Sequence, residues 1–95
     1  MQQAIQEIVL EIPSGCSFDS HFVIARLIKR DYDAYLRFVA DRFDAATIQT
    51  NRVHGQMAEQ ITNLEEQGIV ERLPQESWSE NVQGNPSPCA CWRKR

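Results

Sequence analysis

Long hydrophobic runs are missing from this sequence, since no apolar stretch reaches the ~18 residues that a membrane-spanning helix needs. Basic residues are not in excess either, because 10 Lys and Arg stand against 13 Asp and Glu, for a net charge of −3. Bulk charge alone therefore does not attract a polyanion. The first residues, Met1-Gln2-Gln3, lack the basic and apolar regions of a secretory signal. We expect a cytoplasmic protein with no membrane segment.

Cysteine is scarce, with only Cys16, Cys89 and Cys91 in the chain. An odd number of cysteines without a secretory signal indicates reduced thiols rather than a disulfide framework. In a strand, Cys89 and Cys91 would share one face, and a zinc site would need two further ligands from Cys16, His21 and His54. Zinc frameworks usually place roughly two to four residues between paired cysteines, and this pair has a shorter spacing. We therefore predict small core residues with no metal and no cofactor, and the zinc alternative stays open.

Glycine and proline are also sparse, with four of each in 95 residues, which excludes collagen-like and low-complexity chains. The apolar fraction of 42% and the charged fraction of 24% are ordinary for a folded domain. This length leaves room for one core. We expect a single domain over residues 1–95. Its parts would be a strand or short helix and a turn (1–15), a helical part (17–67) and a hairpin (69–93).

Residues 4–12 fit two structures. Isoleucines three and four apart make a helical stripe, while Ile8, Leu10 and Ile12 alternate as they would in a strand. The window is too short to decide between them. Pro13-Ser14-Gly15 then predicts a turn.

Three helices are predicted from apolar residues spaced three and four apart. The first covers about 18–30, with Ser17 as its N-cap, and the second covers about 32–43. A break at Arg30-Asp31 is favoured, because a basic C-terminal residue there meets an N-cap residue. The third helix begins after Thr47 and runs to about residue 67.

Gly68 is placed where a glycine ends a helix, and residues 69–73 then alternate as a strand. Residues 75–88 are predicted to form an irregular loop, and residues 89–93 a second strand. The predicted core follows the apolar stripes. It consists of Phe22, Val23, Leu27, Tyr35, Leu36, Val39, Val53, Met57, Ile61, Leu64, Val70 and Trp92.

The passage from the third helix into the strand carries a resemblance. A leucine is followed by a glycine, an aliphatic pair and an arginine, at Leu64, Gly68, Ile69, Val70 and Arg72. This pattern resembles the end of the recognition helix and the first wing strand of winged-helix (winged helix-turn-helix) proteins. The resemblance implies an α+β, winged-helix-like domain. It would have three helices and a small antiparallel sheet of two or three strands, with the N-terminal segment as the candidate third strand.

In folds of this family the long helix enters the major groove of duplex DNA. The resemblance therefore implies a DNA-binding module that regulates transcription or a mobile element. Amide side chains can read adenine and arginine can read guanine, while basic residues contact phosphate. The predicted DNA-binding residues are Gln49, Asn51, Arg52, His54, Gln56, Arg93, Lys94 and Arg95, and Asn63 lies on the same helix face.

Two features depart from the DNA-binding pattern. Glu59, Glu65 and Glu66 make the distal half of the helix acidic, and the wing over 78–88 holds no Lys or Arg. The alternative is a protein-interaction module that does not bind nucleic acid, with Trp78 as its anchor. In either case the sequence leaves open whether the chain forms a homodimer.

Catalytic motifs are not evident in this sequence. We find no P-loop, no GxGxxG, no HExxH and no EF-hand loop. Cys16 and His21 lie close together, but no family signature surrounds them, and His21 fits a partly buried packing residue. We therefore expect no enzymatic activity.

Overall fold

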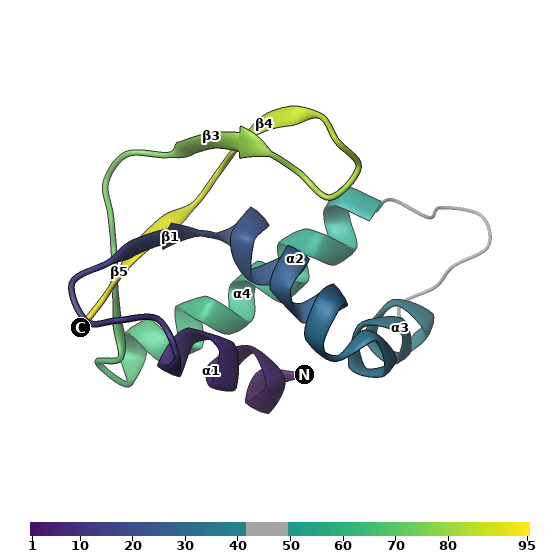
Figure 1. Ribbon diagram of the computed structural model, residues 1–95, viewed down its shortest axis with the longest axis horizontal. Helices are drawn as coiled ribbons and strands as arrows, with labels where there is room; N and C mark the ends of the chain where they lie inside the picture. Colours follow the sequence, from purple (N-terminus) through teal and green to yellow (C-terminus); the bar gives the residue numbers. More distant parts are fainter. Residues whose placement is uncertain (42–49) are drawn as a thin grey trace.

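Four helices and two small antiparallel sheets form the described part of the computed structural model, which covers residues 1–41 and 50–95 without the side chains of 50–52. The elements are α1 (Gln2–Leu10), β1 (Ser17–Asp19), α2 (Ser20–Arg30), α3 (Tyr32–Asp41), α4 (Thr50–Glu66), β2 (Val70–Arg72), β3 (Ser77–Glu80), β4 (Pro86–Cys89) and β5 (Cys91–Lys94). The predicted α+β class is confirmed (Figure 1). The predicted number of three helices is wrong, because the N-terminal segment adds a helix.

The N-terminal segment is helical, and the alternative of a strand there is wrong. In α1, Ile5, Ile8 and Val9 are buried together against α2 and α4. Residues at this spacing share one side of a helix but lie on both sides of a strand. Because α1 covers the core, the third strand of the main sheet comes instead from β1.

Helix α2 begins two residues later than the sequence suggested, and Ser17 is not its N-cap. Asp19 is the cap, with Oδ1 accepting the Phe22 N–H at 2.8 Å. Ser17 instead pairs with Arg93 in β1. This strand turns Phe18 into the core, where its ring stacks on Trp92 with 5.9 Å between ring centroids.

The predicted break between α2 and α3 is confirmed. Asp31 ends α2 and its Oδ1 accepts the Ala34 N–H at 3.1 Å, so it caps α3. Two predicted core residues near this break are wrong, because Phe22 and Leu36 are exposed. Phe38 on α3 is buried in their place, since α3 packs at the edge of the helical body and contacts mainly α2.

The end of α4 is confirmed as predicted. Gly68 has a φ of +76°, and the Ile69 N–H donates to the Leu64 carbonyl at 3.0 Å. The Gly68 N–H donates to Glu65 in the same way, which completes a Schellman cap. The chain then enters β2. The predicted start near Thr47 lies outside the described residues.

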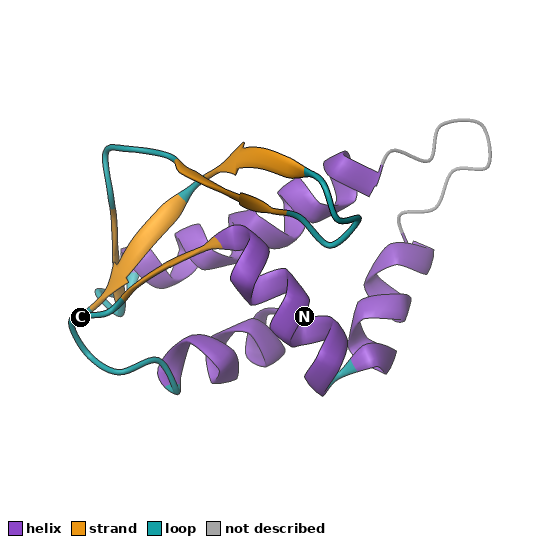
Figure 2. Ribbon diagram, turned by 45° about the horizontal axis from the view of Figure 1, so that its top comes forward, coloured by secondary structure: helices purple, strands orange, loops and turns teal. Residues whose placement is uncertain are grey.

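The main sheet has the strand order β1-β5-β2, so the last strand is central (Figure 2). Trp92 on β5 pairs with Phe18 on one side and Arg72 on the other. It is 1% exposed, which confirms its predicted place in the core. The helices lie on one side of this sheet (Figure 2).

The prediction of an irregular loop over 75–88 is wrong, because β3 and β4 form a hairpin with Ser79 opposite Ser87. Its turn is built on Asn81, whose Oδ1 accepts the N–H groups of Gln83 and Asn85 at 3.0 Å each. Gly84 supplies the φ of +87° that the turn needs. The hairpin arches over α2 and the first turns of α4 (Figure 1). The predicted second strand is therefore divided at Ala90 between β4 and β5.

Candidate functional site

The predicted DNA-reading residues of α4 do not form a described surface. His54 is buried, and its Nε2 lies 2.9 Å from the Tyr35 hydroxyl. Burial is the main cause that lowers the pKa of His54 below its ordinary value, so a phosphate-binding imidazolium is disfavoured. Gln56 is half-buried, and its Oε1 has no hydrogen-bond partner. Gln49 and the side chains of Asn51 and Arg52 lie outside the described residues.

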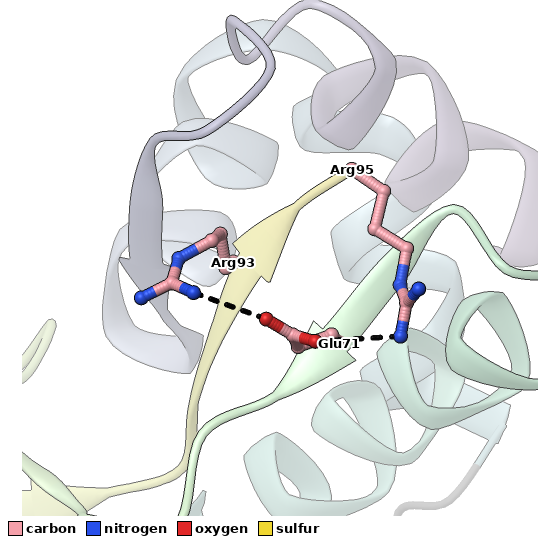
Figure 3. Close-up of polar contacts among 3 residues, drawn as sticks. All are labelled: Glu71, Arg93 and Arg95. Carbon is pink, nitrogen blue, oxygen red and sulfur yellow. Dashed lines mark hydrogen bonds and ion pairs between the residues drawn. The ribbon is translucent and has the colours of Figure 1, made fainter.

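The basic C-terminal residues are already engaged within the protein. Lys94 is buried and its Nζ donates to the Ile12 carbonyl at 3.0 Å. Arg93 and Arg95 both bind Glu71, at 3.1 and 3.4 Å (Figure 3). Figure 1 places the C-terminus far from the Thr50 end of α4. The structure therefore does not bring this cluster together with the start of the predicted recognition helix.

The exposed surface of α4 is acidic where it is described. Glu59, Glu65 and Glu66 are exposed, and no Lys or Arg lies between residues 53 and 66. The Asn63 amide donates to Gln2 of α1 at 3.0 Å and so is used inside the chain. This face repels phosphate rather than attracting it.

The outer face of the β3–β4 hairpin carries an aromatic side chain between two carboxylates. Trp78 is 72% exposed. Glu80 is also exposed, and at a spacing of two residues it shares the Trp78 side of β3. Glu76 is exposed directly before the strand begins. Pro88, directly opposite Trp78 in the ladder, is exposed as well. We call these four residues the outer face.

The inner face of the hairpin is held to the helical body by Asp19. Its Oδ2 accepts hydrogen bonds from the Ser77 and Ser79 hydroxyls, at 2.7 and 2.8 Å. Burial would raise the pKa of Asp19, but the hydrogen bonds from Ser77, the Phe22 N–H and Ser79 outweigh it and hold this pKa below its ordinary value. Asp19 therefore joins β1, α2 and β3 as an ionised carboxylate.

His21 extends this network across both strands of the hairpin. Its Nδ1 lies 2.8 Å from Ser79 Oγ and its Nε2 lies 3.4 Å from Ser87 Oγ. Sequence reasoning missed this role, because it treated residues 75–88 as irregular and so could not pair the serines. The serines that alternate with Trp78 in β3 were the available signal, since alternate residues face one side of a strand.

A cavity of about 420 Å³ lies between the hairpin, α2 and α4. Its lining includes His21 and Ile24 from α2, Gly55 and Ala58 from α4, and Val82 and Ser87 from the hairpin. A Cβ added at Gly55 would meet no atom of another described element within 4 Å. The cavity therefore has partly apolar walls, and the His21–Ser87 pair lines it.

The cysteines occupy three different environments. Cys91 is buried and its thiol donates to the Gln75 carbonyl at 3.1 Å, while Cys89 is half-buried with Sγ 3.9 Å from Ser79 Oγ. Cys16 is exposed. In the described residues, no three of His, Cys, Asp or Glu gather as a metal site requires. None of the helices described here is long and apolar enough to cross a membrane.

Comparison with protein-family models, with curated proteins and with solved structures finds no match for this chain. The described residues form a small compact α+β domain with a three-stranded and a two-stranded antiparallel sheet. Such a fold does not by itself fix a function, which depends on the chemistry of its surfaces.

Proposed function

We propose that this domain is a protein-interaction module that binds a basic segment of a partner through the outer face of the hairpin. The observation that carries the proposal is the exposure of Trp78, 72% against 1% for Trp92. A large aromatic side chain gains free energy when a partner buries it, and tryptophan is enriched among the residues that dominate binding.

The charge around Trp78 defines the chemistry of the partner. Residues 73–92 include Glu76 and Glu80 and hold no Lys or Arg. Neither carboxylate forms an ion pair with another described residue. A Lys or Arg of the partner can lie over the indole, an interaction of about 0.5–2 kcal/mol, while the carboxylates bind neighbouring cations.

The hairpin presents this surface in an ordered form. Its inner serines are bound by Asp19 and His21, and its turn is fixed by Asn81. Pro88 lies directly opposite Trp78 in the ladder and adds a conformationally restricted residue to the same face. Binding to a preorganised surface loses less conformational entropy, which favours affinity.

DNA binding by a winged-helix domain stays a prediction. The glycine-capped passage from α4 into β2, and the pairing of β2 with β5, agree with the arrangement that the resemblance implies. Two observations favour the protein partner over duplex DNA. The basic C-terminal residues bind groups within the protein, and the described surface of α4 is acidic.

Fluorescence polarisation tests the proposal, with a labelled peptide of alternating arginine and serine as the probe and a glutamate–serine peptide as its charge control. We expect the wild type to bind the arginine peptide, and Trp78→Ala to weaken binding about tenfold or more. The matched control is Tyr32→Ala, since Tyr32 is 55% exposed and begins α3, a helix that lies away from the hairpin (Figure 1).

Equal binding by the Trp78→Ala and Tyr32→Ala proteins would contradict the proposal. Labelled random duplex DNA is measured in the same series. Tight DNA binding that weakens steeply with salt, together with no preference for the arginine peptide, would instead favour the DNA-binding prediction.

A further inference from the structure

The hydrogen-bond network behind the hairpin fixes which nitrogen of His21 carries the proton. A serine hydroxyl has one hydrogen, and that of Ser79 is donated to Asp19 Oδ2 at 2.8 Å. Ser79 can therefore only accept from His21 Nδ1, which lies 2.8 Å away. In a neutral ring with hydrogen on Nδ1, Nε2 holds a free lone pair. Ser87 Oγ lies 3.4 Å from Nε2, and with this tautomer its hydroxyl is the donor.

From this geometry we propose that Ser87 is an acyl-accepting nucleophile, that His21 is its general base, and that the cavity beside them takes a small activated ester. Nucleophile, imidazole and an orienting group in contact are the arrangement that activates a serine. Here Ser79 and Asp19 are the positioning residues that keep the tautomer. The inference is independent of the proposed partner binding and departs from the sequence-based expectation of no enzymatic activity.

The cavity offers room beside the hydroxyl. Its volume of about 420 Å³ suits a short acyl group with its leaving group, and Ile24 and Val82 supply apolar walls. Gly55 lies in the interior of α4, where glycine costs about 1 kcal/mol relative to alanine. Among the described residues, no atom outside the backbone of α4 lies within 4 Å of where its Cβ would be, so this glycine keeps the cavity open.

The backbone also fixes the position of Ser87. It stands between Pro86 and Pro88, whose rings restrict φ, and directly opposite Ser79 in the hairpin ladder. The two hydroxyls thus lie on one face of the hairpin, with the His21 ring bonded to both. A nucleophile held on a paired strand keeps its geometry better than one on a free loop.

In the proposed reaction, Ser87 Oγ attacks the ester carbonyl carbon while its proton passes to His21 Nε2. The bond from that carbon to the leaving oxygen breaks, and His21 returns the proton to the departing alkoxide. Water, deprotonated by His21, then cleaves the acyl-serine to release a carboxylic acid and restore the hydroxyl. A positioned base contributes about 10²–10⁴-fold, so we expect slow but measurable turnover.

The test uses p-nitrophenyl acetate hydrolysis and covalent labelling by a fluorophosphonate, with the labelled residue identified by peptide mass spectrometry. We expect the label on Ser87 and its loss in Ser87→Ala. His21→Gln should slow labelling by about 10²-fold or more. Gly55→Leu should also block labelling, because it fills the cavity while leaving the hydroxyl and the imidazole unchanged and suits a helix.

Two controls keep the result interpretable. Cys16→Ala removes an exposed thiol outside the cavity lining and should leave labelling and turnover intact, and Ser14→Ala removes an exposed serine elsewhere. Circular dichroism checks that each variant is folded. If His21→Gln does not fold, Gly55→Leu carries the test. Label on another residue, or equal labelling of Ser87→Ala and wild type, would overturn the inference. The hydrogen bonds of Asp19 and His21 would then serve only to hold the hairpin in place.

Discussion

The helical body with its three-stranded sheet and the β3–β4 hairpin are held in place by different forces. In the body, Ile5, Leu27, Met57 and Leu64 have no exposed surface, and they pack together in one cluster. The hairpin residues are half-buried or exposed, and Asp19 and His21 hold them through hydroxyl groups. The body is stabilised by apolar burial and the hairpin by directed hydrogen bonds.

Because of this difference, the residues that stabilise the fold are not the residues that form the proposed binding surface. Polar attachment lets the hairpin stand over α2 and α4 with a cavity beneath it and a tryptophan on its outer side. A hairpin packed on the core through its apolar side chains would have buried Trp78. The two tryptophans therefore serve as reporters, Trp92 for the body and Trp78 for the hairpin.

The largest expected effect comes from replacing the tryptophan of the body. Trp92→Ala removes a side chain that stacks on Phe18 and lies at the centre of the sheet, so we expect a loss of about 3–5 kcal/mol in the free energy of unfolding. Urea denaturation followed by circular dichroism measures it. Trp78→Ala is the matched control, with an expected change of about 0.5 kcal/mol or less. Equal losses of unfolding free energy in the two variants would contradict the claim that the body and the hairpin are stabilised differently.

A smaller effect is expected from the attachment of the hairpin. Asp19→Ala removes both the N-cap of α2 and the acceptor of two hydroxyls, so we expect a loss of about 1–3 kcal/mol in unfolding free energy. Faster amide hydrogen exchange in β3 and β4 than in β5 would show that the hairpin is released first. Exchange that rises equally in all three strands would mean that the hairpin is not separately attached.

Acid should weaken the same attachment. Because the pKa of Asp19 is lowered in the folded state, its contribution to stability is complete above the ordinary aspartate pKa and is lost as pH falls through the folded value. Asn can still cap the helix but carries no charge, so in Asp19→Asn the acid-dependent part of the unfolding free energy should shrink. If the unfolding free energy of that variant depends on acid pH as in the wild type, Asp19 is not the cause of the acid sensitivity.

A further pH effect is expected from His54, which is buried beside the cavity. Burial lowers the pKa of His54, so its contribution to stability is complete above the ordinary value of 6.5 and is lost as pH falls from there toward the folded pKa. Unfolding measured across mildly acidic pH should show this loss in the wild type and less of it in His54→Gln. Tyr35→Phe, which removes only the hydroxyl partner, should retain it.

The smallest effect is expected at the C-terminal ion pairs. Glu71→Gln breaks the contacts to Arg93 and Arg95 on the surface of the body (Figure 3), and we expect a change of about 1 kcal/mol or less. Thermal unfolding in low and high salt measures it, and the small loss should vanish in high salt. A larger, salt-independent loss would show that polar contacts also stabilise the body.

Local signals in the sequence predicted the elements whose ends are set by neighbouring residues. Gly68 ends α4 because its positive φ suits glycine, and Asp31 separates α2 from α3 by capping. These events need only residues a few positions apart. The apolar spacing likewise identified Met57, Ile61 and Leu64 as core.

The sequence could not predict what depends on distant partners. Ser17 has the chemistry of an N-cap, but pairing with Arg93 places it in a strand. The hairpin was hidden because its strands are rich in serine and proline and show no apolar alternation. The roles of His54 and Lys94 were also missed, since both meet their partners only after folding, at the Tyr35 hydroxyl and the Ile12 carbonyl.

The most direct test of the central claim uses the two indole N–H signals in a ¹H–¹⁵N correlation spectrum, assigned with Trp78→Phe. The peptide of alternating arginine and serine is titrated into the wild-type protein. The account predicts that the Trp78 signal shifts with saturation while the Trp92 signal stays in place. A shift of Trp92 alone, or no shift of Trp78 at saturating peptide, would contradict the claim that the hairpin's outer face is the binding surface.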